Sequence, residues 1–139
     1  MPHVGERRTP RPGDDPGAAV LEANVDRLLA EHTPEIQAIE RALRATIRAA
    51  FPDAVEQVDF GNKLIAFGRS MKMRGLLFAI IAHKSHVNLQ LADGADLPNA
   101  DGSIEGTGKR IRHVKVRSVE AATSPAVRNA IDAQIAHVR

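Results

Sequence analysis

A strongly basic stretch near the C-terminus is the least ordinary feature of this 139-residue sequence. Residues 106–117 read Gly-Thr-Gly-Lys-Arg-Ile-Arg-His-Val-Lys-Val-Arg, with Lys, Arg or His at six of the last nine positions. Lys and Arg form charge-assisted hydrogen bonds to phosphate and carboxylate groups, and glycines let backbone N–H groups approach an anion. The stretch therefore predicts a site for a small anionic molecule or an acidic protein partner, built from Gly106, Thr107, Gly108, Lys109, Arg110, Arg112, His113 and Lys115.

The same stretch has a purely structural interpretation. Residues 109–116 alternate as a strand, and neither of its two faces is purely apolar. This pattern predicts an edge strand, where charged side chains prevent edge-to-edge aggregation. The stretch is not a phosphate-binding loop of the Walker A type, because position 103 is Ser where that motif needs Gly and position 110 is Arg where it needs Ser or Thr.

A second candidate site lies on a predicted strand at residues 87–91. Its alternation places His86, Asn88 and Gln90 on one side. If this strand neighbours the basic one, His113 and Lys115 join these residues in a polar patch that could hold a small polar ligand. The alternative is a sheet face wetted by solvent.

A third strand, Leu76 to His83, is apolar on both faces and is therefore predicted to be central in the sheet. Its outward-facing side chains need cover. A ligand pocket or a homodimer across the sheet would supply that cover.

Metal sites and catalytic groups are only sparsely represented. His83 and His86 provide two ligands where a stable site needs three or four, and no serine stands in a nucleophile-elbow context. No pair of carboxylates is marked by its spacing. We therefore expect no catalytic residue, no metal and no cofactor, and the enzymatic alternative is a small hydrolase or transferase with its site on the polar sheet face.

Composition narrows the class of protein further. The absence of cysteine excludes disulfides and thiolate sites and fits a reducing compartment. Residues 1–68 hold 8 Lys/Arg against 11 Asp/Glu, whereas residues 69–139 hold 11 against 6, so the C-terminal half is the candidate anion-facing half. The absence of Trp and Tyr disfavours stacking on nucleic acid. No apolar run approaches the ~20 residues of a membrane span, so we expect a cytoplasmic protein.

The order of the predicted elements indicates an α+β fold, a two-layer sandwich in which N-terminal helices and a C-terminal helix flank an antiparallel sheet of about five strands. Residues 1–17 are rich in Pro and Gly and are predicted to be a flexible tail, which leaves 18–139 as a single domain. Apolar spacing and Thr-Pro or Ser-Pro start signals predict helices at about 18–31, at 34–50 and from 125 onward. Period-two patterns predict strands at 55–60, 64–67, 76–83, 87–91 and 109–116, with a Gly61-Asn62 turn in which Gly61 has a positive φ.

From about Val25 to Arg139 the chain resembles the YdhG-like family, a domain of unknown function. The matching segments are Phe-Pro-Asp-Ala at 51–54, Asp-Phe-Gly at 59–61, His-Lys-Ser-His-Val-Asn-Leu at 83–89 and Glu-Gly-Thr-Gly-Lys-Arg-Ile-Arg-His-Val-Lys-Val at 105–116. The resemblance implies a small α+β domain. Some relatives are described as frataxin-like iron chaperones, which would make Asp53, Glu56 and Asp59 the iron contacts, although iron binding of that kind favours a denser acidic surface than this one.

Overall fold

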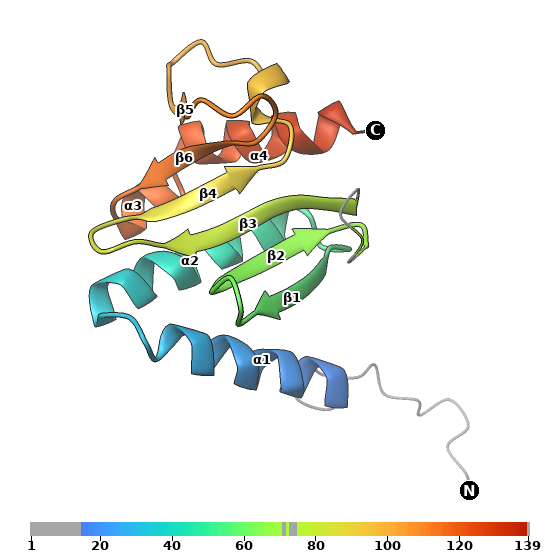
Figure 1. Cartoon of the computed structure of the whole chain (residues 1–139), viewed down its shortest axis with the longest axis vertical. Coiled ribbons are helices and arrows are strands. Elements are labelled where there is room, and N and C mark those ends of the chain that lie inside the picture. The colour runs from blue at the N-terminus through green and yellow to red at the C-terminus, as the bar shows by residue number, and fades with distance from the viewer. Residues whose placement is uncertain (1–14, 71, 73–74, 139) are drawn as a thin grey trace, which may run out of the picture.

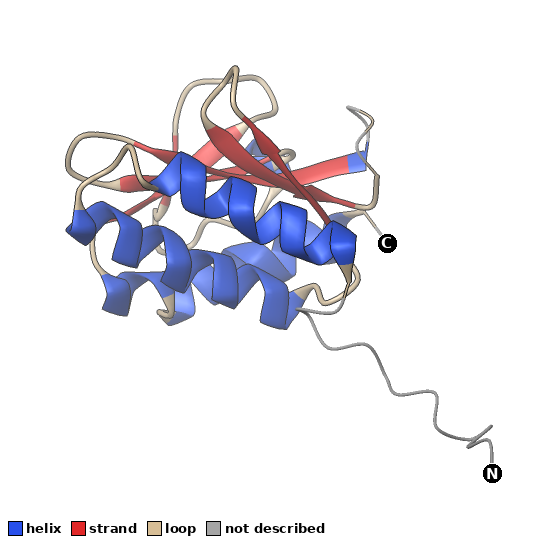
Figure 2. Ribbon diagram, turned by 90° about the horizontal axis from the view of Figure 1, so that it is seen from below, coloured by secondary structure: helices blue, strands red, loops and turns tan. Residues whose placement is uncertain are grey.

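The computed structural model describes residues 15–70, 72 and 75–138 and confirms the α+β sandwich. Six antiparallel strands form one sheet in the order β1-β2-β3-β4-β6-β5, and the helices lie on one face of it (Figures 1 and 2). No helix in these residues is long and apolar enough to cross a membrane. In chain order the elements are α1 (Pro16–Leu29), α2 (Pro34–Ala50), β1 (Val55–Asp59), β2 (Leu64–Gly68), β3 (Leu76–Ala82), β4 (Val87–Leu91), the 3-10 turn η3 (Gly94–Asp96), β5 (Ile104–Glu105), β6 (Arg112–Val116), α3 (Val119–Ala122) and α4 (Pro125–His137).

The three long helices share one start signal. Asp15, Thr33 and Ser124 each accept a hydrogen bond from a backbone N–H of the first turn, and a proline with a fixed φ follows each of them. The prediction for α2 is confirmed, and α4 begins at the expected residue. Helix α1 begins at Pro16 rather than at residue 18, because Asp15 caps it, so the last two residues of the predicted tail belong to the helix. Residues 1–14 of that tail lie outside the described residues.

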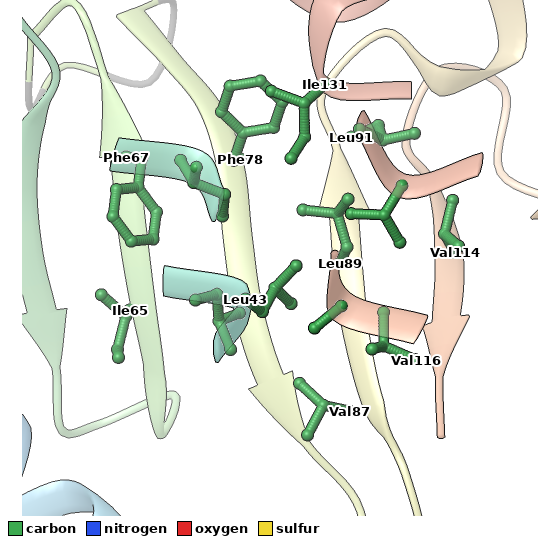
Figure 3. Close-up of a cluster of buried hydrophobic side chains, with 14 of the residues drawn as sticks. Leu43, Ile65, Phe67, Phe78, Val87, Leu89, Leu91, Val114, Val116 and Ile131 are labelled. Atoms are coloured by element: carbon green, nitrogen blue, oxygen red, sulfur yellow. The ribbon is translucent and has the colours of Figure 1, made fainter. Parts of the chain in front are cut away.

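The hydrophobic core fills the space between the sheet and the helices. Figure 3 shows Leu43 of α2 and Ile131 of α4 against side chains from the central strands. The apolar stripe of α2 has the helical spacing expected from the sequence, and every member of it is buried: Ile36, Ile39, Leu43 and Ile47.

Strand β3 is central, as its two apolar faces predict, and β2 and β4 flank it. The β1–β2 turn differs from the prediction. Gly61 does not take a positive φ, and Lys63 does (φ 55°). Asp59 explains the difference, because its carboxylate accepts hydrogen bonds from the backbone and side-chain N–H groups of Asn62 and fixes the first half of the turn.

The basic stretch is not the edge strand that its charges predict. Strand β6 begins only at Arg112, and the two-residue strand β5 pairs beside it and forms the edge. Residues 109–111 are irregular because the chain here contacts η3, where the N–H of Ala95 donates to the carbonyl of Arg110. Strand β5 and the single-turn helix α3 were not predicted.

Candidate functional site

The sheet face opposite the helices, called the open face below, carries two rows of side chains that cross the sheet. Cross-strand pairs connect the neighbours in each row, and no helix of the described residues covers them (Figure 2). Along both rows the residues are apolar on β2 and β3 and polar on β4 and β6. One row consists of Gln57, Ala66, Ala79, Gln90, His113 and Glu105, and the other of Asp59, Leu64, Ile81, Asn88 and Lys115.

Strand β4 lies directly beside β6, which is the condition that the sequence left open. Gln90 pairs with His113, and Asn88 pairs with Lys115. With His86, just before β4, these residues form what we call the polar patch: His86, Asn88, Gln90, His113 and Lys115. All five side chains are half-buried. The structure therefore brings together five of the eleven residues predicted to bind a ligand.

The amide of Asn88 has an unused hydrogen-bonding atom. Its Nδ2 lies 3.2 Å from Nε2 of His83, whose ring stacks on that of His86 with centroids 4.8 Å apart. Its Oδ1 is buried and has no hydrogen-bond partner among the described residues. An orphaned polar atom of this kind is costly in a folded protein and is commonly satisfied by a water molecule or a ligand.

The patch is electrostatically positive. Burial, and then the charges of His83, Lys115 and Arg117, lower the pKa of His86. Glu105 is the carboxylate paired with this region. Its Oε1 is 3.9 Å from Nζ of Lys115, beyond hydrogen-bonding distance, and both side chains are partly exposed. Lys115 is therefore available to an incoming anion.

The loop half of the predicted site does not join the patch. The Nη2 of Arg110 donates to Oδ1 of Asp93 at 2.7 Å, and the Nε of Arg112 donates to the carbonyl of Gly108 at 2.7 Å. Arg112 is two residues from the buried Val114, so its side chain leaves β6 on the same face as Val114 and on the opposite face from Lys115. Within the predicted cradle of residues 106–108, the carbonyl of Gly108 thus accepts a hydrogen bond from Arg112.

The remaining loop residues lie at the rim of the sheet. Gly106 has a φ of 118°, which favours glycine, and a Cβ added to it would lie 3.4 Å from Nδ1 of His113. Thr107, Gly108 and Lys109 are exposed. Lys109 therefore contributes charge to the surface without a defined place in the patch.

Beside the patch, the centre of the open face is hollow. A broad depression of about 1220 Å³ reaches from the β1–β2 turn at Asn62 to the end of β4 at Asp93. Arg110 and Ile111, in the loop before β6, and the end of α4 at residues 137–138 also line it. Two paired alanines, Ala66 and Ala79, form part of its floor, and Gln90 of the polar patch lies on its border. The sequence analysis named a ligand pocket at this face as one of two ways to cover the outward side chains of β3, but it named none of the lining residues of β2 and β3. The signal for Ala66 and Ala79 is one small residue in each of two apolar strands.

A buried polar network closes one end of the hollow. Asp93 is 6% exposed and Gln134 is fully buried. The side-chain N–H of Gln134 donates to the Asp93 carboxylate at 2.9 Å, and the backbone N–H of Asp93 donates to Oε1 of Gln134 at 2.8 Å. This network was not predicted, although a glutamine three residues after Ile131 on an apolar stripe was a usable signal.

The acidic residues proposed for iron do not converge. The Glu56 carboxylate accepts a hydrogen bond from Arg44 on the helix side of the sheet, whereas Asp59 lies on the open face and caps its own turn. Asp53 is exposed in the preceding turn. Within the described part of the chain no three His, Asp or Glu side chains are placed to hold a metal ion.

The fold and the open face define an α+β domain that presents one solvent-facing sheet surface with an apolar centre and a cationic side. No protein-family model, curated protein or solved structure matches the chain.

Proposed function

We propose that the protein is a non-enzymatic binding domain that takes an anionic small ligand on the polar patch. The observation that carries the proposal is the pairing of β4 with β6, which sets Asn88 beside Lys115 and Gln90 beside His113. An acid or phosphate group above these pairs would accept hydrogen bonds from an ammonium group, an imidazole and two amides. The patch contains no hydroxyl, thiol or carboxylate that could serve as a nucleophile, which favours binding over hydrolysis or group transfer.

Replacing Lys115 by glutamine is expected to weaken sulfate binding about tenfold, because the variant loses a charge-assisted hydrogen bond. Lys109→Gln removes the same charge from the exposed loop and is expected to leave the affinity nearly unchanged. Calorimetric titration of both variants at low and high salt measures the difference, and salt should weaken wild-type binding. Equal losses in the two variants would show that general surface charge, and not the patch, attracts the anion.

Sulfate binding is expected to take up protons below the ordinary pKa of histidine. His86 has a lowered pKa because burial and the positive groups around it, His83, Lys115 and Arg117, disfavour its charged form. A bound dianion offsets that repulsion and raises the pKa of His86, so the complex holds more protons than the free protein and binds more tightly as pH falls.

Calorimetry in buffers of different ionisation enthalpy measures this uptake, and sulfate itself does not titrate in this range. His86→Asn is expected to lose most of the uptake, whereas His137→Asn, at the end of α4, is expected to retain it. Uptake that is unchanged in His86→Asn would remove His86 from the site.

The frataxin-like alternative makes a different prediction. An anaerobic ferrous titration that gives heat and proton release below millimolar iron would support metal delivery. No such response is expected here, because Glu56 is already paired with Arg44.

A further inference from the structure

We infer that the ligand is an amphipathic anion, with its acid group on the polar patch and an apolar chain or ring in the hollow across β2 and β3. The inference rests on the proposed function and adds the class of ligand. Small acids without an apolar part, such as sulfate or acetate, would then occupy only one end of the site.

From β2 to β6 the composition of the open face changes in one direction. The side chains facing outward from β2 and β3 are aliphatic, and two of them, Ala66 and Ala79, are a directly paired couple. The next strand contributes amides, and β6 contributes His113 and Lys115. A molecule lying across the strands would therefore meet apolar floor first, then hydrogen-bond donors, and then positive charge.

Continuity between the two halves comes from β4. Gln90 pairs with Ala79 on one side and with His113 on the other, and it also borders the hollow. Asn88 occupies the same place in the second row, between Ile81 and Lys115. Of the five residues of the polar patch, Gln90 is the one that also lines the hollow. From β2 to β6 the rows cross three strand spacings, or about 14 Å, which is the length of an extended medium-chain acid.

The shape of the face favours a small ligand over a second copy of the chain. The depression measures about 1220 Å³, slightly above the usual size of small-molecule pockets. Two identical hollow faces related by a twofold axis would enclose a void, and voids lose the contacts that stabilise a packed interface.

The test is a chain-length series. Acetate, hexanoate, octanoate and decanoate are titrated into the full chain below their micellar concentrations, with octyl phosphate and inorganic phosphate as the corresponding phosphate pair. Calorimetry and amide NMR are suitable, because the chain has no Trp or Tyr to report by fluorescence. The affinity is expected to rise about twofold to fourfold per added methylene and then to level off when the chain reaches the end of the hollow. A plateau distinguishes a bounded site from detergent-like association.

Matched variants separate the two ends of the site. Ala79→Leu adds a side chain to the floor of the hollow and is expected to weaken decanoate binding at least tenfold while sulfate binding stays unchanged. Ala66→Leu should act in the same way from the neighbouring strand. Ala45→Leu places the same side chain on the exposed surface of α2, on the helix layer, and is expected to bind decanoate like the wild type.

The outcomes are distinct. Sulfate binding that depends on Lys115, combined with decanoate that binds no more tightly than acetate, would overturn this inference and leave the proposed function standing. Absence of binding by every acid would overturn both. A wild-type dimer that Ala79→Leu converts to a monomer, as measured by sedimentation, would show that a second copy covers the face and would overturn the amphipathic ligand. Whether the natural ligand is a carboxylate or a phosphate follows from comparing decanoate with octyl phosphate.

Discussion

Replacing Arg44 by methionine is expected to destabilise the protein by about 3–5 kcal/mol, because the change leaves the buried carboxylate of Glu56 with only the exposed Arg48, 3.7 Å away, as a cationic neighbour. Arg44 is 7% exposed, and its Nε lies 2.5 Å from Oε2 of Glu56 in β1. Its two terminal nitrogens donate to the carboxylate of Glu22 in α1. One side chain of α2 thus connects the first helix, the second helix and the edge of the sheet. It keeps its charge because the hydrogen bonds that it donates to both glutamates raise its pKa against the effect of burial.

Urea unfolding of three variants tests this account. Glu56→Leu combined with Arg44→Met removes both buried charges and is expected to recover most of the lost stability, since apolar residues of similar volume replace a buried ion pair at little cost. Arg41 is on the same helix as Arg44 and forms an exposed ion pair, 2.9 Å long, with Asp26 of α1. Arg41→Met removes this pair and should cost less than about 1 kcal/mol of stability. The account is contradicted if Arg44→Met lies within 1 kcal/mol of the wild type or if the double variant is the least stable of the set.

Most of the framework could be predicted because it depends on local signals. Thr33-Pro34 and Ser124-Pro125 mark helix starts through capping and a fixed φ, and both are confirmed. Alternation along residues 87–91 placed Asn88 and Gln90 on one side because the side-chain period of a strand is two. The same parity argument named His113 and Lys115 as neighbours if the two strands were adjacent, which they are.

The parts that were missed depend on contacts between distant residues. Strand β5 has only two residues and exists because it pairs with β6, so no periodicity announces it. The floor of the hollow requires that Ala66 and Ala79 are paired side by side on neighbouring strands, a register that composition does not contain. Arg110 was assigned to an anion, but a buried aspartate seventeen positions earlier accepts its hydrogen bond. The charge of a residue indicates which groups it can bind, but the fold determines which of those groups lies within hydrogen-bonding distance.

Asp93 is that partner of Arg110. Replacing Gln134, which exchanges two hydrogen bonds with Asp93, is expected to have the second large effect on stability. Gln134→Leu should destabilise the protein by about 2–5 kcal/mol at neutral pH, because it leaves the backbone N–H of Asp93 and one carboxylate oxygen buried without a hydrogen bond. The leucine itself fits an apolar stripe, so the cost reports the lost hydrogen bonds rather than a cavity.

The stability lost in Gln134→Leu should be larger at neutral pH than at acid pH. Burial pushes the pKa of Asp93 upward, but hydrogen bonds from Arg110 and Gln134 outweigh this effect, and the net pKa is lowered. A lowered folded-state pKa contributes stability above the unfolded value of about 3.9, and this stability is lost as pH falls through the folded pKa. Gln134→Leu removes part of that contribution, so its deficit should be largest near pH 7 and should shrink below pH ~4. The cost of the unpartnered backbone N–H remains.

Arg110→Gln provides the matched control for this network. It removes the other hydrogen bond to Asp93, but its side chain is 74% exposed, so water can replace it and the loss should stay below about 1 kcal/mol. Because the Asp93 network closes one end of the hollow, Gln134→Leu should also weaken decanoate more than sulfate. A deficit that is equal at pH 3 and pH 7, or an Arg110 variant as unstable as the Gln134 variant, would show that the buried glutamine does not hold the carboxylate as the structure indicates.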